Sequence, residues 1–247
     1  MELATYVALS RLDAQSRAMD VTAGNIANAS TPGFKTERTL FSDWLGRQKD
    51  AAPPPGGGSV AYVQDRATWR DGAQGAIQHT GNPLDLAIGG EGWFTVDTPR
   101  GPRLTRAGRF SLGADGTIED LDGNALLDAN GQKVQISPRD TRLQVAGDGT
   151  LSSENGQIAR IGVVVPADPN RMQAEGARLM RADTPTSAVA APHVVQGAVE
   201  GSNVQPVLET TRMMNQLREF QFTTQFVQAE SDRQQAMIDK IAGPART

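Results

Sequence analysis

The stretch of this 247-residue chain that decides its fold is Asn25-Ile26-Ala27-Asn28-Ala29-Ser30-Thr31-Pro32-Gly33-Phe34. The residues before it have helical periodicity, with apolar side chains spaced by seven and by the adjoining three or four positions: Leu9, Leu12, Met19, Ala23 and Ile26. Pro32 disfavours helical geometry at Thr31, and Gly33 follows at once. Residues 2–28 are therefore predicted to form one helix that ends in this stretch.

A second helical pattern closes the chain between residues 206 and 241. Its apolar line is Met213, Leu217, Phe220, Val227, Ile238 and Ile241. Asn203 is predicted to cap this helix, and Pro206 lies in the first turn, where proline is tolerated. Polar residues at Thr224, Ser231 and Gln234 weaken the apolar line, so a pair made by the two helices alone is expected to be marginally stable.

The region between the helices has the pattern of β-strands and turns. Residues 60–165 contain dense turn signals such as Asp115-Gly116 and Asn130-Gly131, which favour an antiparallel sandwich or barrel-like module. Residues 35–50 are ambiguous, residues 166–200 are expected to be irregular, and Pro53-Pro54-Pro55-Gly56-Gly57-Gly58 indicates a loop or hinge.

The predicted fold class is α+β. Long N- and C-terminal helices pair in a coiled-coil-like stem, and a central antiparallel β-rich module lies between them in sequence. An alternative is that both helices pack on the β module as ordinary core elements. Four segments are predicted. Residues 1–34 are a stem helix with its following segment, and residues 35–80 are a linker with the Pro/Gly hinge. Residues 81–200 are the β-rich module, and residues 201–247 are the second stem helix.

Composition narrows the function. The net charge is −4 without a basic block, which argues against nucleic-acid binding. The chain has no cysteine, so disulfides, cysteine nucleophiles and thiolate metal sites are excluded. We expect no membrane insertion, because no apolar run approaches the ~20 residues of a membrane span. The start of the chain lacks the pattern of a cleaved signal peptide, so export by another route is expected.

Signals for catalysis are weak. Glu91 and Asp97 are candidate paired carboxylates of a glycoside hydrolase, but Glu91 lies in a glycine-rich turn and Asp97 precedes Thr98-Pro99. The two histidines, His79 and His193, have no nucleophile at a suggestive spacing. We therefore expect no enzyme activity, no cofactor, no metal and no small-molecule ligand.

Four ordered segments resemble the axial proteins of the bacterial flagellum, which include rod and hook subunits. They begin at Ala23, Gly81, Leu104 and Gly201 and read AGNIANASTPGFK, GNPLDLAIGGEGWFTV, LTRAGRF and GSNVQP. The departures from the family pattern are Gly24, in place of an asparagine, and Pro32 beside the glycine. Within the family, the length and residues 4–10 are most similar to the proximal-rod member; distal-rod and hook-type proteins are alternatives.

The resemblance implies a structural subunit of the flagellar basal-body rod, the drive shaft of the flagellum. Such subunits are delivered unfolded by the flagellar type III export apparatus and stack helically with copies of themselves and other rod subunits. A secreted β-rich binding module, in which the helices are incidental, is the remaining alternative. The residues expected at the assembly interface are Leu12, Met19, Asn25, Ile26, Asn28, Phe34, Met213, Leu217, Phe220, Val227, Ile238 and Ile241.

Overall fold

The computed structural model describes residues 2–47 and 59–242, and the side chains of residues 6–40 and 68–240. The chain divides into two compact units. The terminal unit comprises Met1–Ile26, Glu37–Trp69 and Gln205–Thr247. The β unit comprises Ala27–Thr36 and Arg70–Val204, so the chain passes between the units four times.

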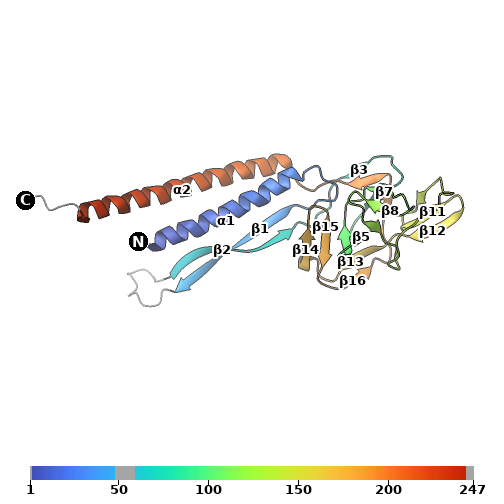
Figure 1. Ribbon diagram of the computed structural model, residues 1–247, viewed down its shortest axis with the longest axis horizontal. Coiled ribbons are helices and arrows are strands. Elements are labelled where there is room, and N and C mark those ends of the chain that lie inside the picture. The colour runs from blue at the N-terminus through green and yellow to red at the C-terminus, as the bar shows by residue number, and fades with distance from the viewer. Residues whose placement is uncertain (1, 48–58, 243–247) are drawn as a thin grey trace, which may run out of the picture. The chain divides into compact units, whose positions relative to one another are not determined.

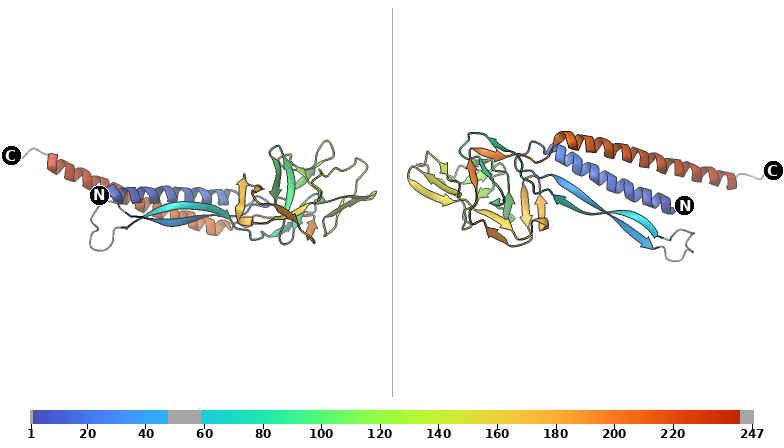
Figure 2. Two further views of the ribbon diagram at one scale, coloured as in Figure 1. Left: turned by 90° about the horizontal axis from the view of Figure 1, so that it is seen from below. Right: turned by 180° about the vertical axis from the view of Figure 1, so that it is seen from behind.

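The terminal unit contains the two long helices, α1 (Glu2–Ala27) and α2 (Pro206–Ala242). Both agree with the sequence prediction to within one residue at each end. Figures 1 and 2 show that the two helices run antiparallel to each other. Neither combines the length and the apolarity that a membrane span needs, within the described residues.

The prediction that Asn203 caps α2 is wrong. The Asn203 side-chain oxygen accepts hydrogen bonds from the backbone N–H and the hydroxyl of Thr36, both at 2.7 Å. Its amide group donates to the carbonyls of Asp71 and Ala73. Because these partners belong to distant segments of the β unit, local sequence gives no sign that the side chain is already engaged.

The interpretation of residues 35–80 as a linker is corrected by two long strands, β1 (Glu37–Arg47) and β2 (Ser59–Arg70), which pair as a two-stranded sheet (Figure 1). β2 is rich in the aromatic and β-branched residues that favour strands, but the pairing joins segments on both sides of the proline–glycine run. The predicted hinge itself, at residues 53–58, lies outside the described residues.

The β unit is built on a nine-stranded sheet. Its strand pairs are antiparallel, as predicted for the β-rich central region. Seven strands follow one another in the order β14-β15-β6-β5-β9-β8-β7, while β13 pairs with β5 and β16. Their bounds are β5 (Trp93–Thr98), β6 (Gly101–Thr105), β7 (Phe110–Leu112), β8 (Ile118–Asp120), β9 (Ala125–Leu126), β13 (Val163–Pro166), β14 (Met172–Glu175), β15 (Leu179–Ala182) and β16 (Thr186–Ala188).

Smaller sheets complete the β unit. β10, β11 and β12 form a three-stranded sheet, β17 pairs with β4, and β18 pairs with β3. Their bounds are β3 (Ile77–His79), β4 (Leu86–Ile88), β10 (Gln144–Val145), β11 (Thr150–Ser153), β12 (Gly156–Arg160), β17 (Val194–Gln196) and β18 (Ala198–Glu200), with a 3-10 turn at Pro169–Arg171.

The strands after residue 166 correct the expectation that residues 166–200 are irregular. That stretch is interrupted by prolines, but β14 to β18 are short strands. Some of their partners are distant in sequence, as β18 pairs with β3 across more than a hundred residues. Residues 133–136 make only isolated bridges, at Lys133 and Gln135.

One apolar core lies inside the β unit. Phe94 of β5 and Phe110 of β7 meet edge to face, with ring centroids 5.6 Å apart. The aliphatic residues around them come from most of the strands: Leu86, Ile88, Val96, Ile118, Leu126, Val134, Ile136, Leu151, Ile161, Val163 and Val194. This core gives the β unit a rigid frame on which the segments next to the helices are fixed.

Candidate assembly interface

The inward line of α2 is a regular series of less exposed residues. It consists of Glu209, Met213, Gln216, Phe220, Thr223, Val227, Glu230 and Gln234, spaced alternately by four and three. All other described side chains of the helix are exposed. This spacing is that of a helical seam, yet five of the eight side chains are polar.

The outer face of α2 is made of exposed large apolar residues. Phe222 is 74% exposed and Phe226 is 51% exposed, and they lie one helical turn apart. The other members are Val207, Leu208, Met214 and Leu217. Met237 and Ile238 are also exposed, but they follow Gln234 by three and four residues and so continue the side of the inward line. The helix thus directs many polar side chains inward and many apolar ones toward solvent, the reverse of what an isolated amphipathic helix requires.

The buried side of α1 is lined by small and polar residues: Ala8, Ala14, Gln15, Ala18, Thr22 and Asn25. Both amide atoms of Gln15 are buried without a hydrogen-bond partner among the described residues. Small residues let a second helix approach, but they bury little apolar area. The packing of α1 within the terminal unit is therefore weakly stabilised by the hydrophobic effect.

The residues expected at the interface are not brought together on one surface. Leu12, Met19, Ile26, Met213, Phe220 and Val227 are half-buried. Leu217 is exposed on the outer face of α2, and Ile238 is exposed four residues after Gln234, on the side of the inward line. Ile241 lies in the helix, but its side chain is outside the described ones.

Asn25, Asn28 and Phe34, the remaining residues expected at the interface, do not lie on the outer face of α2. Asn25 and Phe34 are buried inside the terminal unit and the β unit respectively, so in this conformation they stabilise the subunit and do not present a surface to a neighbour. Asn28 is half-buried and accepts a hydrogen bond from the Thr31 hydroxyl at 3.1 Å.

A buried carboxylate organises the base of the terminal unit. Glu209, only 1% exposed, accepts hydrogen bonds from Arg38 and Arg212, both at 2.7 Å from the same oxygen. Its other oxygen is 3.4 Å from the amide nitrogen of Asn25. Asn25 also makes two hydrogen bonds with the backbone of Glu37, at 2.8 and 2.9 Å, so this cluster joins the end of α1, the start of β1 and the first turn of α2.

A second buried carboxylate lies in the β unit. Glu200 is fully buried and accepts from Lys35 at 2.6 Å, from the Gly75 N–H at 2.9 Å and from Arg106 at 2.9 Å. The Glu200 backbone carbonyl accepts from the Gly33 N–H at 2.8 Å. Three separated segments are thereby tied to β18.

The cations around Glu200 are themselves buried. Lys35 also donates to the Ala73 carbonyl, and Arg106 donates to the Gly90 carbonyl and lies over the Trp93 ring, 5.4 Å from its centroid. Burial lowers the pKa of Lys35, although the hydrogen bond that Lys35 donates to Glu200 acts in the opposite direction. Since two cations share one carboxylate, each needs these further acceptors to offset its desolvation.

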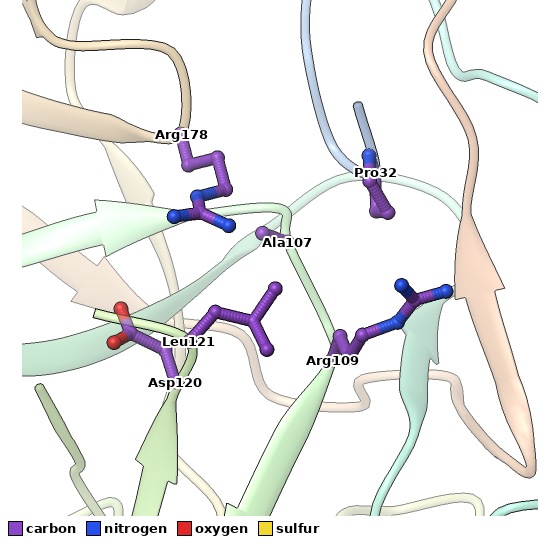
Figure 3. A pocket seen from close by; sticks show the side chains of 6 residues that line it. All are labelled: Pro32, Ala107, Arg109, Asp120, Leu121 and Arg178. Carbon is purple, nitrogen blue, oxygen red and sulfur yellow. The ribbon is translucent and has the colours of Figure 1, made fainter. Parts of the chain in front are cut away.

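A small hollow beside this region is lined by Pro32, Ala107, Arg109, Asp120, Leu121 and Arg178 (Figure 3). Arg178 is bound by Asp122 at 2.6 Å. The volume of the hollow, about 10 Å³, is that of a single water. It therefore offers no room for a small-molecule substrate.

Two sets of residues were not predicted from the sequence. Phe222 and Phe226 are four residues apart, about one helical turn, and this spacing could be read from the sequence. Arg106 lies in the LTRAGRF segment and Glu200 directly precedes the GSNVQP segment, but the sequence predicts no role for either residue. Only their convergence in space reveals one.

Comparisons with known proteins agree with this architecture. Residues 6–35 match the family described as "Flagella basal body rod protein", residues 87–153 the "Flagellar hook protein FlgE/F/G D1 domain", and residues 195–240 the "Flagellar basal body rod FlgEFG protein C-terminal". The chain is 36% identical to the flagellar basal-body rod protein FlgF of Mesorhizobium japonicum, over 90% of this chain and 91% of the relative.

Two further relatives span nearly the whole chain. FlgF of Caulobacter vibrioides is 34% identical over 98% of both chains. FlgG of Bacillus subtilis is 28% identical over 95% of this chain and 97% of the relative.

Two long terminal helices, with an antiparallel β unit between them in sequence, define a structural class of protein. Within that class, the chain belongs to the family of flagellar basal-body rod proteins. It is a structural component of the flagellar basal body, homologous to FlgF and FlgG, and assembles with other rod components. This family is structural and is not a known enzyme family.

Proposed function

We propose that this chain polymerises helically into the rod through its terminal helices. In this proposal α1 and α2 pair in a coiled-coil-like stem, and the outer face of α2 packs against copies of the chain and neighbouring rod subunits. The supporting observation is the outer face itself, with its six exposed large apolar residues.

The energetics favour a protein occupant for this face. Burying an exposed phenylalanine contributes about 1.5–3 kcal/mol, so Phe222 and Phe226 alone offer a substantial gain on association. α2 has four basic and five acidic side chains, a net charge of −1. A near-neutral apolar face suits another helix better than an anionic lipid surface, which attracts clusters of basic residues.

The contact is expected to be head-to-tail. The outer face of α2 differs in chemistry from the exposed side of α1, where Arg11, Asp13, Arg17 and Asp20 lie, so the two faces are not copies of each other. A heterologous contact that does not close into a ring generates an open helix, the geometry of a rod.

We further propose that the subunit occupies the proximal rod and reaches it unfolded, through the flagellar type III export apparatus, without a cleaved signal. The higher identity to FlgF relatives, 36% and 34%, than to an FlgG relative, 28%, supports the proximal position. A distal-rod or hook-type position is the alternative. A secreted module acting through the β unit alone is less favoured, because the family matches include both ends of the chain.

The test replaces Phe222 and Phe226 by serine in the full chain, expressed in cells that lack the native copy. We expect the purified variant to keep its helical and β content, because both side chains are exposed. Its amount in isolated basal bodies should fall at least tenfold, which corresponds to a loss of ~1.4 kcal/mol or more in the free energy of association. The matched control is Leu112→Ser, which removes a similarly exposed apolar side chain (51%) from the β unit. Normal incorporation of the double variant would refute the proposal.

A further inference from the structure

We propose that Glu200 and Glu209 are positioning residues that couple the two ends of the chain. Each carboxylate belongs to the segment that leads into α2 or begins it, and each binds a cation in the segment that follows α1. The consequence is that residues 33–38 become ordered only together with residues 200–209.

The evidence in the terminal unit is the link between Glu209 and Arg38. Arg38 is the second residue of β1, and its guanidinium is 2.7 Å from the buried Glu209 carboxylate. The neighbouring Glu37 N–H donates to Asn25, whose amide points to the same carboxylate. The start of β1 is thus held through a side chain of α2 that lies more than 170 residues away in sequence.

The evidence in the β unit is the link between Glu200 and Lys35. Their side chains are 3% and 1% exposed and 2.6 Å apart. Two further hydrogen bonds lie beside this pair. The Gly33 N–H donates to the Glu200 backbone carbonyl, and the Thr36 N–H donates to the side-chain oxygen of Asn203. The segment after α1 therefore lies against the segment before α2 over four consecutive residues.

Burial makes the coupling cooperative. A buried carboxylate that loses its cation keeps its desolvation cost without the compensating attraction. If residues 33–38 detach, both Glu200 and Glu209 are left in that state, and each then favours opening of its own segment. The two pairs thus act as an all-or-none connection between the chain ends, a property that holds in the free subunit and does not depend on the proposed polymerisation.

The test compares Arg38→Met with Arg212→Met by amide hydrogen exchange in the free full-length chain. Both substitutions remove one 2.7 Å contact to the same Glu209 oxygen, but Arg212 lies in α2 itself, three residues from Glu209. We expect Arg38→Met to speed exchange at the Glu37 amide roughly tenfold or more, through local opening, while Arg212→Met leaves it within about twofold.

A parallel comparison tests Glu200. Lys35→Met should speed exchange at the Gly33 and Thr36 amides, while the amides of β5 keep their native rates. Asp122→Asn, which removes the exposed pair with Arg178, is the control and should leave all of them unchanged. Equal acceleration throughout the chain, or none at Glu37, Gly33 and Thr36, would overturn the proposal.

Discussion

Gly33 occupies a backbone conformation and a space that only glycine fits. Its φ is +72°, and a Cβ atom there would lie 2.3 Å from the backbone nitrogen of Ala107 and from the carbonyl carbon of Arg106. At this point the segment after α1 crosses the backbone of Arg106 and Ala107, and the space between them has no room for a side chain. Gly24, in contrast, has open space around its would-be Cβ and sits in helical geometry.

The two glycines should respond oppositely to alanine. Gly33→Ala is expected to destabilise the chain by about 1–2 kcal/mol from the left-handed conformation alone, with a further cost from the backbone clash. Gly24→Ala should stabilise α1 by about 0.5–1 kcal/mol, because glycine costs conformational entropy in a helix. Urea unfolding followed by circular dichroism measures both, and a neutral Gly33→Ala would contradict the crossing described here.

Glu154 gives a residue-scale prediction for pH. Hydrogen bonds from the Thr141 N–H and hydroxyl, and then from the Arg142 N–H, lower the pKa of Glu154 from 4.5 to about 2. Because the folded pKa lies below the unfolded one, the stabilisation is present above pH 4.5 and is lost as the pH falls toward 2.

Acidification should therefore release the 141–142 segment. Amide exchange at Thr141 and Arg142, corrected for intrinsic rates, is expected to accelerate between pH 4.5 and pH 2. In Glu154→Gln the same amides should lose that pH dependence. A similar dependence in the variant would assign the effect to another group.

At the scale of elements, the ends of the helices were predictable from the sequence, but the side chains that face inward were not. Proline, glycine and apolar periodicity fix where α1 and α2 begin and end. The inward line of α2, however, contains Gln216 where the sequence prediction chose the apolar Leu217, which the structure leaves exposed. Choosing apolar residues as inward-facing fails on a helix whose apolar residues are divided between two faces.

Strand β1 and its pairing with β2 were missed for a different reason, although β2 lies in the region 60–165 that was predicted to contain strands. Neither has a turn signal of the two-residue hairpin type beside it, and each finds its partner across residues that the sequence marks as a break. The same holds for β18 and β3, which pair over more than a hundred residues. Non-local pairing leaves little trace in a local pattern.

The two faces of α2 should be separable by mutation. Phe220→Asp with Val227→Asp places two charges on the inward line, so we expect protease cleavage in α1 and α2 to accelerate while the β unit keeps its fold, and incorporation into rods to stop. Limited trypsin digestion and the motility of complemented cells measure these effects. Normal motility would show that the inward line is dispensable.

At the scale of the whole molecule, the β unit is assembled from two stretches of chain. Residues 27–36 add Phe34, Lys35 and Thr36 to a unit otherwise formed by residues 70–204, and all three are buried there. The guanidinium of Arg70 lies over the Phe34 ring, 5.4 Å from its centroid. The resemblance to axial proteins drew attention to this stretch, but the predicted segments divided it between the stem, residues 1–34, and the linker, residues 35–80.

This division predicts that residues 70–204 alone form an incomplete unit. The Asp71 N–H donates to the Thr36 carbonyl at 2.9 Å, so a linker of a few glycines can join residue 36 directly to residue 70. We expect this fusion of residues 27–36 to 70–204 to exceed the 70–204 fragment in unfolding free energy by about 3–5 kcal/mol, the usual cost of removing a buried phenylalanine.

The control for this experiment is the same fusion with Phe34→Ala. It keeps Lys35 beside Glu200, so it should recover only part of the gain, and the difference between the two fusions isolates the burial of the ring. Urea unfolding at neutral pH measures all three proteins. Equal stability of the fragment and the intact fusion would mean that residues 27–36 lie on the β unit without stabilising it, because a docked segment that buries a phenylalanine and pairs a carboxylate must raise the free energy of unfolding.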